Sequence, residues 1–311
     1  MNKKSLILKY FQKADLLTTR KSDYCRSITS LFKWMVENDK ANSDLISKLL
    51  NIQSHHHARI ISRQEAILAG SEEISFLLKN HTQLSFTPFV KDGKSIKIGQ
   101  TVAEIEGVSS EILGLERIVL NILQRMSGIA TETNNLTRQD PPFLAATRKT
   151  PWMVLDKKAV AVGGGLTHRL SLADGIIVKD NHLTFLRKKF GLKDDVLATK
   201  KALQFILPKA QNQLVEVEVK TEKEALETVK TFNKLNKNNY LAIMFDNFSP
   251  ASFQSVLSKL GNLYDLSSVI LEASGGINNK NIGEWSKTGA DILSIGALTH
   301  SPHAVNLSLE F

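Results

Sequence analysis

The sequence predicts an α/β protein whose second half folds as a parallel sheet, closed into a complete or incomplete barrel. From residue 143 onward, short apolar segments alternate with longer helical ones. A β-α-β-α alternation implies parallel strands joined by right-handed crossovers. Residues 1–50 instead have amphipathic helical spacing, and residues 92–107 have the alternation and turn residues of short antiparallel strands. An open, doubly wound sheet is the alternative for the second half.

The first half contains few strand signals. Amphipathic helices are expected within residues 1–50, with a turn at Asn42-Ser43-Asp44. A short strand is expected over residues 58–62. The turns of residues 92–107 are followed by a long helical pattern from residue 109 to about residue 136. This half therefore predicts a mixed helical and antiparallel region.

The second half contains six expected strands and five helices between them. The expected strands are 143–147, 175–178, 214–219, 240–245, 269–273 and 291–295. The expected helices are 183–190, 197–206, 222–235, 250–260 and 279–288. Units of about 25–40 residues each are typical of an α/β barrel.

Composition and charge restrict the class of protein. The 311 residues suggest one large or two moderate domains. Forty Lys and Arg against 31 Asp and Glu give a net charge of +9, which suits polyanionic partners such as phosphates or nucleic acids. The basic residues are spread along the chain without one basic block, which argues against nucleic-acid binding.

We expect a cytoplasmic protein. Cys25 is the only cysteine, so no disulfide forms within the chain, as in a reducing compartment. No apolar run approaches the roughly 20 residues that span a bilayer. The apolar stretch after the basic start, Leu6-Ile7-Leu8, is too short for the core of a signal peptide.

Polar or glycine residues follow or end all six expected strands. In an α/β barrel the chemistry lies at the carboxyl ends of the strands. The six sets are Arg148-Lys149, Lys179-Asp180-Asn181-His182, Glu216 with Glu218, Asp246-Asn247, Ser274-Gly275-Gly276 and Gly296-Ala297. The sequence thus predicts a site at this edge of the sheet.

Two acidic residues share one face of a strand. Glu216 and Glu218 are two positions apart, so both side chains point the same way. A buried carboxylate needs a cationic partner. Lys149 and Lys179 are candidates, or Mg²⁺ between Glu218 and Asp246. An ordinary ion-pair network inside the barrel is the alternative interpretation.

The ends of the last two strands suit a phosphate. Glycine lets the backbone approach an anion closely, and barrels often bind phosphate in the loops after late strands. These loops contain Ser274-Gly275-Gly276 and Ser294-Ile295-Gly296. Tight turns without a ligand are the alternative.

Five cationic side chains are expected near one pocket, and that much positive charge requires a polyanion. They are Arg117, Arg148, Lys149, Arg169 and Lys179. A guanidinium matches the planar geometry of a carboxylate or phosphate. A ligand with two carboxylates together with a pyrophosphate donor would balance this charge.

The ordered motifs resemble those of the quinolinate phosphoribosyltransferase family over about residues 58–311. The motifs are Glu116-Arg117, Ser127-Gly128-Ile129-Ala130-Thr131, Ala146-Thr147-Arg148-Lys149-Thr150, Gly163-Gly164-Gly165-Leu166-Thr167-His168-Arg169-Leu170, Lys179-Asp180-Asn181-His182, Val215-Glu216-Val217-Glu218-Val219, Asp246-Asn247, Glu272-Ala273-Ser274-Gly275-Gly276-Ile277 and Gly296-Ala297-Leu298-Thr299.

The resemblance implies an N-terminal α/β sandwich domain followed by an incomplete, TIM-like α/β barrel. The domains would be residues 1–127, with a helical N-terminal extension, then the catalytic barrel of residues 128–297, then a tail of residues 298–311 that returns to the first domain. The family works as a homodimer or an assembly of dimers. Arg117 matches an arginine that reaches the site of the partner chain.

The resemblance also implies a reaction and its residues. Quinolinate would take the phosphoribosyl group of phosphoribosyl pyrophosphate and lose carbon dioxide, giving nicotinate mononucleotide and pyrophosphate for NAD synthesis. The expected catalytic residues are Lys149, Lys179, Glu218 and Asp246, with Glu218 and Asp246 also holding Mg²⁺. The expected substrate and phosphate contacts are Arg117, Arg148, His168, Arg169 and Lys179 for the substrates, and Ser274, Gly275, Gly276 and Gly296 for the 5′-phosphate.

Two segments depart from the family pattern. The run Thr150–Asp156 is about two residues shorter and lacks an arginine, which alters one wall of the expected quinolinate pocket. The family's Gly-Asp-Leu-Thr-Thr element corresponds either to Ser43-Asp44-Leu45-Ile46-Ser47 or to Asp15-Leu16-Leu17-Thr18-Thr19. The first has the better spacing to Ala58-Arg59-Ile60, and residues 1–30 would then be an extension. The alternatives are a related transferase with another acceptor base, a non-catalytic paralogue that binds a pyridine or phosphoribosyl ligand, and a nucleic-acid-binding protein.

Overall fold

The computed structural model describes residues 2–137, 140–236 and 238–311, which form two compact units. The barrel unit comprises the described residues among 1–12, 138–148 and 168–297. The sandwich unit comprises residues 13–137, 149–167 and 298–311, again where described. The sequence predicted domain boundaries at residues 127/128 and 297/298. The observed division has more segments, because the chain passes between the two units several times.

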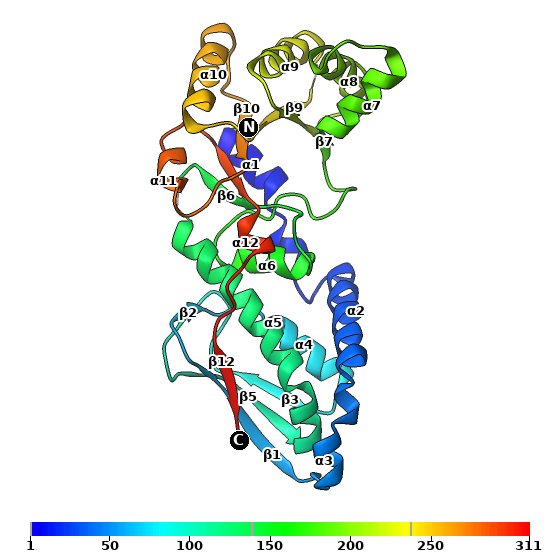
Figure 1. Ribbon diagram of the computed structural model, residues 1–311, viewed down its shortest axis with the longest axis vertical. Helices are drawn as coiled ribbons and strands as arrows, with labels where there is room; N and C mark the ends of the chain where they lie inside the picture. The colour runs from blue at the N-terminus through cyan, green and yellow to red at the C-terminus, as the bar shows by residue number, and fades with distance from the viewer. Residues whose placement is uncertain (1, 138–139, 237) are drawn as a thin grey trace. The chain divides into compact units, whose positions relative to one another are not determined.

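Six parallel strands form the sheet of the barrel unit (Figure 1). The strands are β6 (Phe143–Ala146), β7 (Ile176–Val178), β8 (Leu214–Val219), β9 (Tyr240–Asp246), β10 (Val269–Ser274) and β11 (Ile292–Ile295). Their spatial order is β6-β11-β10-β9-β8-β7. From β7 to β11 each strand lies beside the one before it, and β11 then meets β6. This order is that of a barrel that is open between β6 and β7. In a doubly wound sheet, by contrast, the order in which strands are added reverses at a switch point.

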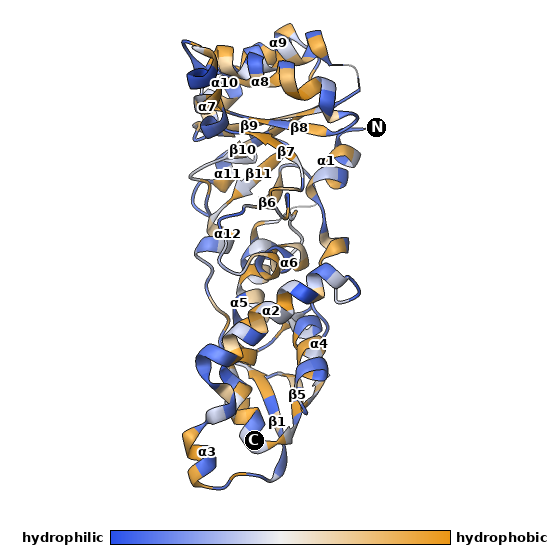
Figure 2. Ribbon diagram, turned by 90° about the vertical axis from the view of Figure 1, so that its right-hand side faces the viewer, coloured by the Kyte–Doolittle hydropathy of each residue, from blue (hydrophilic) through white to orange (hydrophobic). Residues whose placement is uncertain are grey.

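The helices of the barrel unit include the crossovers between these strands. They are α1 (Lys3–Phe11), α7 (Asp180–Phe190), α8 (Asp195–Ala210), α9 (Glu222–Leu235), α10 (Pro250–Leu263), α11 (Ile282–Trp285) and α12 (Ala297–His300), which continues into the sandwich unit. Figure 2 shows hydrophobic residues along the strands and hydrophilic ones on the outer helical surfaces. All six residues of β8 are buried, as expected for a parallel strand covered on both faces.

A four-stranded antiparallel sheet with order β12-β1-β5-β3 supports the sandwich unit. The strands are β1 (His55–Ser62), β3 (Ser85–Pro88), β5 (Thr101–Val108) and β12 (Leu307–Glu310), and a separate pair joins β2 (Ala66–Ile67) to β4 (Ser95–Ile96). The helices are α2 (Ser22–Asp39), α3 (Leu45–Leu49), α4 (Ser71–His81), α5 (Ser109–Leu136) and α6 (Val154–Val162). The buried face of α5 includes Ile112, Leu115, Val119, Leu123 and Met126, which follow helical periodicity.

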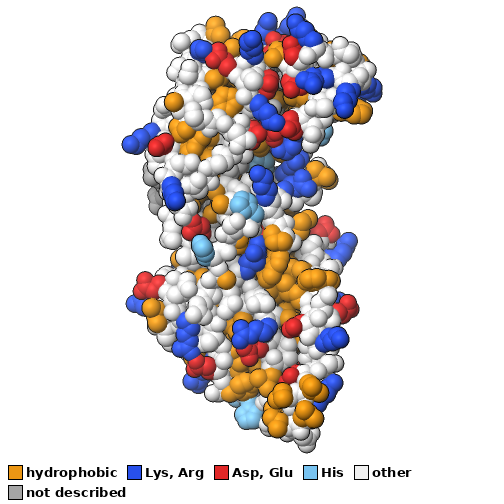
Figure 3. All heavy atoms as spheres, in the orientation of Figure 1, with side chains coloured by type: hydrophobic (Ala, Val, Ile, Leu, Met, Phe, Trp, Pro, Cys, Tyr) orange, Lys and Arg blue, Asp and Glu red, His pale blue; other side chains and the backbone are white. Residues whose placement is uncertain are grey.

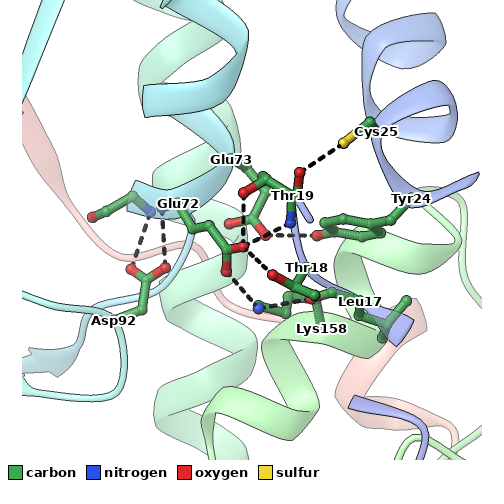
Figure 4. Close-up of polar contacts among 10 residues, drawn as sticks. Leu17, Thr18, Thr19, Tyr24, Cys25, Glu72, Glu73, Asp92 and Lys158 are labelled. Atoms are coloured by element: carbon green, nitrogen blue, oxygen red, sulfur yellow. Dashed lines mark hydrogen bonds and ion pairs between the residues drawn. The ribbon is translucent and has the colours of Figure 1, made fainter. Parts of the chain in front are cut away.

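A buried polar cluster ties α2, α4 and α6 together (Figure 4). One oxygen of Glu72 accepts hydrogen bonds from Thr18 and Thr19, and the other pairs with Lys158 Nζ at 2.8 Å. Glu73 is completely buried, and Tyr24 donates its hydroxyl to Oε1 of Glu73 at 2.6 Å. Among the described residues, none forms a hydrogen bond with the second oxygen of Glu73.

The two neighbouring glutamates have opposite pKa shifts. Burial is the largest influence on Glu72 and raises its pKa, but the hydrogen bonds from Lys158, Thr19 and Thr18 outweigh it and lower the value to about 2. Burial raises the pKa of Glu73 to about 7, and the charge of Asp92 adds to this rise. Glu73 thus favours its neutral form in the folded protein.

The expected elements of the second half are confirmed within a few residues at each end. Helix α8 ends four residues later than expected, at Ala210, and α11, expected over residues 279–288, is shortened to Ile282–Trp285. Side chains of Asn278 and Asn281 bind the carbonyl of Gly276, so the chain forms a turn where a helix was expected. The helical segment of residues 1–50 divides into α1, α2 and α3. No helix in the described part of the chain is long and apolar enough to cross a membrane.

We expect Glu73→Gln to stabilise the protein more at pH 8 than at pH 5. The folded-state pKa of about 7 lies above the ordinary value of 4.5. Stability from neutral Glu73 is therefore present at low pH and is lost as the pH rises through about 7. The amide removes this loss and retains an acceptor for Tyr24, so the gain at pH 8 should be about 2–3 kcal/mol.

Denaturant unfolding at the two pH values measures this difference. Glu72→Gln is the matched control and should destabilise the protein at both pH values, because the pKa of Glu72 is lowered to about 2. An effect of Glu73→Gln that is the same at pH 5 and pH 8 would contradict the prediction.

Candidate active site

The carboxyl ends of the six strands meet at one edge of the barrel unit's sheet. In the register of the parallel pairs, Ser274 lies opposite both Asp246 and Ser294. Glu218 lies opposite Met244, two residues before Asp246, so Glu218 and Asp246 occupy the same face of the sheet. The parallel topology thus brings together polar residues that lie far apart in the sequence.

A lysine–glutamate pair occupies the ends of β7 and β8. Lys179 Nζ lies 2.5 Å from Oε2 of Glu218, whose side chain is 9% exposed. The amide of Lys179 donates to Nδ1 of His182, which fixes the start of α7. Close pairing in a partly buried position holds both charged groups in place.

A second lysine adds to the charge near these ends. Lys220 Nζ lies 2.7 Å from Oδ2 of Asp180. This hydrogen bond raises the pKa of Lys220, with smaller contributions from the charges of Asp246 and Glu218. A hollow of about 350 Å³ borders the same ends and is lined by residues that include Lys220, Asn247 and Ser249. Figure 3 shows acidic and basic side chains interspersed on the visible face of this unit.

One histidine lies between two carboxylates inside the barrel unit. His168 Nε2 is 3.4 Å from Oε2 of Glu272 and 3.6 Å from Oε2 of Glu216. All three residues are buried. Ser294 donates its hydroxyl to the other oxygen of Glu272 at 2.5 Å. We call His168, Glu216 and Glu272 the buried triad.

The buried triad binds a proton strongly. Burial lowers the pKa of His168, but the charges of Glu272 and Glu216 outweigh it and raise the pKa to about 9. Burial and the charge of Glu272 also raise the pKa of Glu216. Nδ1 of His168 accepts the amide hydrogen of Arg169, which an imidazolium cannot do. This contact therefore favours the neutral ring with its proton on Nε2, toward the carboxylates, and opposes the charged form that the two acids favour.

A metal ion fits the buried triad less well than a proton does. The ligand atoms of the three residues lie within 4.8 Å of one another, as in many metal sites. A metal-binding histidine, however, needs an unprotonated Nε2 and usually donates its other N–H to a neighbour. Here Nδ1 accepts a hydrogen bond, so Nε2 carries the proton.

Arg169 lies within electrostatic range of Glu216 of the buried triad, and Arg148 lies within electrostatic range of Arg169. Burial lowers the pKa of Arg169, and the charges of Glu216, Arg148 and Asp174 also act on it. Arg148 is exposed and follows β6. Two guanidinium groups near a buried histidine form a strongly cationic environment, which suits a ligand with more than one negative charge.

The ends of β9 and β10 approach each other too closely for a side chain at residue 275. A Cβ on Gly275 would lie 2.2 Å from Oδ1 of Asn247, and φ is +95° at this position. The amide of Asn247 donates to the carbonyl of Ser274 at 2.8 Å. Glycine is therefore required here, and it leaves the backbone at this edge accessible.

Two expected site residues, Lys149 and Arg117, belong to the sandwich unit. Lys149 is exposed, and its carbonyl accepts a hydrogen bond from the hydroxyl of Thr299 at 2.9 Å. Arg117 lies on α5 with a 67% exposed side chain, paired with Glu116 at 2.8 Å.

The shortened segment after Lys149, residues 150–156, is held by a contact with Arg125 of α5. Arg125 binds both oxygens of buried Asp156 at 2.8 Å each, and its guanidinium lies 5.2 Å from the ring of Trp152. Thr150 also donates to Asp156. The segment is thus held by contacts that do not need the family's missing arginine.

The structure gathers most of the expected residues and adds two that were not expected. In the barrel unit it brings together Lys179, the acids and the glycines at the strand ends, with Arg148, His168 and Arg169. The unexpected residues are Glu272 and Lys220, and Ser294, expected in a phosphate-binding loop, donates its hydroxyl to Glu272. Glu272 lies two positions before Ser274 on the same strand, so both side chains point to the same face. This spacing could have identified Glu272 from the sequence. The catalytic and binding roles stay predictions.

An open α/β barrel with this cationic edge defines a class of protein that binds polyanionic ligands. Residues 129–310 match the family model described as the C-terminal domain of quinolinate phosphoribosyl transferase, and residues 44–127 match the N-terminal domain. The chain belongs to the quinolinate phosphoribosyltransferase family.

Individual relatives agree with this assignment. A protein of Methanothermobacter thermautotrophicus named probable nicotinate-nucleotide pyrophosphorylase (carboxylating) is 31% identical, covering 90% of this chain and 97% of its own. Quinolinate phosphoribosyltransferase (decarboxylating) 1 of Nicotiana glauca is 33% identical, covering 81% and 73%. The solved structure of nicotinate-nucleotide pyrophosphorylase from Francisella tularensis has a TM-score of 0.75 at 29% identity, covering 92% and 96%.

Replacing Glu272 by Gln should lower the pKa of His168 by at least about one pH unit, because it removes the closest negative charge. NMR titration of the imidazole, assigned with a His168→Asn variant, measures this shift. Glu218→Gln is the control, since Glu218 pairs with Lys179. Equal pKa values for His168 in the wild-type, Glu272→Gln and Glu218→Gln proteins would show that the buried triad does not set the protonation of His168.

Proposed function

We propose that this protein transfers the phosphoribosyl group of phosphoribosyl pyrophosphate to quinolinate with loss of carbon dioxide. The products would be nicotinate mononucleotide and pyrophosphate, in the de novo synthesis of NAD. The observation that carries the proposal is the cationic group Arg148, His168, Arg169 and Lys179 beside the acids at the ends of β8 and β9. The family assignment supports the same reaction.

The cationic side chains suit the two carboxylates of quinolinate. Guanidinium groups bind carboxylates through paired hydrogen bonds. Arg148 and Arg169 lie close enough to influence each other electrostatically, and a dianion between them would relieve their repulsion. Arg117 and Lys149 complete the proposed set of substrate contacts.

The acids suit the other substrate. When the pyridine nitrogen displaces pyrophosphate, positive charge develops on the ribose ring. Carboxylates that are held in place stabilise such charge without having to reorganise. Glu218 is held by Lys179, and Asp246 accepts a hydrogen bond from Asn247 at 3.0 Å. We assign these two acids to that role.

The same two acids fit a magnesium ion. Both occupy one face of adjacent strands, and carboxylate oxygens are the ligands that Mg²⁺ prefers. A bound Mg²⁺ would neutralise charge on the leaving pyrophosphate. Glu218 and Asp246 would hold it.

Backbone groups suit the 5′-phosphate. Gly275, Gly276 and Gly296 follow β10 and β11, next to Ser274, and their small size lets an anion approach the main chain. After transfer, the ring loses its 2-carboxylate. We propose that the nearby cations, Lys149 among them, stabilise the carbanion that remains.

A mixed assay tests the proposed function. Purified protein with phosphoribosyl pyrophosphate and Mg²⁺ should form nicotinate mononucleotide and carbon dioxide from quinolinate, and neither from nicotinate. Lys149→Ala should reduce kcat by at least about a hundredfold, since it removes a cation at the reacting centre. Product from nicotinate without gas would indicate a different acceptor base, and ligand binding without turnover would indicate a non-catalytic paralogue.

We also propose a homodimer in which Arg117 reaches the partner's site. Arg117→Ala and Lys179→Ala should each be nearly inactive alone. Mixed after mild dissociation, they should regain about a quarter of wild-type activity, since half of the randomly formed dimers would contain one intact site of two. Wild-type subunits treated in the same way control for losses. No recovery from a mixed dimer confirmed by mass spectrometry would place Arg117 in its own chain's site.

A further inference from the structure

Helix α1 lies outside the ranges that match the family. Those ranges begin at residue 44, and α1 spans Lys3–Phe11. It nonetheless belongs to the barrel unit, not to the sandwich unit that follows it in the sequence. An extension that joins the catalytic barrel calls for a structural reason.

The outer side chains of α1 contact the beginnings of the barrel strands. Lys3 pairs at 3.0 Å with Asp291, the residue before β11. Lys4 lies over the ring of Phe143, the first residue of β6. Tyr10 packs against Tyr240, the first residue of β9. The helix therefore lies across the amino ends of three strands, away from the catalytic edge.

Other side chains on the same side of α1 enter the core. Leu6, Ile7 and Phe11 are each 1% exposed. Burial of three large side chains anchors the helix by hydrophobic contacts. Its C-terminal residue, Phe11, is thereby fixed in the interior of the barrel unit.

Phe11 contacts His168 in two ways. The backbone amide of His168 donates to the carbonyl of Phe11 at 2.8 Å. The two rings meet edge to face, with centroids 4.8 Å apart and an interplanar angle of 79°. His168 also has φ of +52°, a conformation unfavourable for a residue with a side chain, so surrounding contacts must maintain it.

We propose that α1 is a positioning element that, through Phe11, holds His168 and the adjoining Arg169 in the arrangement that binds quinolinate. This inference rests on the proposed function. Glu216 and Glu272 hold the ring at Nε2, the Arg169 amide holds Nδ1, and Phe11 holds the backbone and one side of the ring. Phe11 is a positioning residue, since it acts through His168.

The test compares two equally buried residues of α1. Phe11→Ala removes the ring contact with His168, and Leu6→Ala removes core packing elsewhere on the helix. Both should lower the midpoint of thermal unfolding. Phe11→Ala alone should raise the KM for quinolinate about three- to tenfold, the equivalent of one aromatic pair. The KM for phosphoribosyl pyrophosphate should change less than about twofold.

A third variant covers the case in which Phe11→Ala does not fold. Phe11→Leu keeps most of the apolar volume and loses the ring, so it should fold and raise the KM for quinolinate by a smaller factor. If Leu6→Ala raises this KM as much as the Phe11 variants do, or if no variant raises it, the positioning role is overturned.

A measurement without substrate separates this proposal from the proposed function. Hydrogen exchange by mass spectrometry over residues 166–170 reports the amide of His168. Exchange there should be at least about tenfold faster in Phe11→Ala than in Leu6→Ala. If exchange is faster in Phe11→Ala but the wild-type protein has no activity, the proposed function would be rejected and the positioning role retained. Equal exchange in the two variants would reject the positioning role.

Discussion

Burial of Glu216 and Glu272 within a parallel sheet is the constraint on which the site depends. Carboxylates that are buried without a cationic partner strongly destabilise a fold. The chain meets this requirement with His168, which lies between them and whose pKa is raised to about 9. The backbone of His168 takes a left-handed conformation, and its ring faces both acids. The electrostatics of the interior thus determine where this side chain can lie.

The need to balance these buried negative charges also positions the residues around the buried triad. Ser294 satisfies one oxygen of Glu272, and Lys179 and Arg169 lie within electrostatic range of Glu216. The acids at the carboxyl ends of the strands, in contrast, pair with lysines that are partly exposed. Buried charges therefore fix the geometry of the site, and exposed charges remain available to ligands.

The strands of the barrel unit could be predicted because each is a short segment that is apolar at all but at most two positions and is bounded by polar residues or glycine. The strand ends could be predicted for the same reason, since parallel topology places them at one edge. Glu272 was not recognised as a member of the site because one acid inside an apolar strand gives no sign of its partner. The pairing with His168 joins residues about a hundred positions apart in the sequence.

The role of residues 1–30 could not be predicted from the sequence for a different reason. An amphipathic helix shows that it will bury one face, but not which surface it will cover. Helix α1 covers the amino ends of barrel strands, whereas α2 joins the sandwich unit, although each buries apolar side chains. The chain changes unit again between Arg148 and Lys149, and between Thr167 and His168, at residues expected to bind substrate.

The pairing of β12 with β1 has a consequence for the way the protein is made. Strand β1 begins at residue 55, and the partner that covers its free edge is formed by residues 307–310. On a ribosome, β1 and β5 emerge long before β12 is synthesised, so one edge of the sheet remains unpaired for most of translation. Uncovered edges are templates for pairing with other chains. Nascent and C-terminally truncated forms of this protein should therefore be the ones that need chaperones.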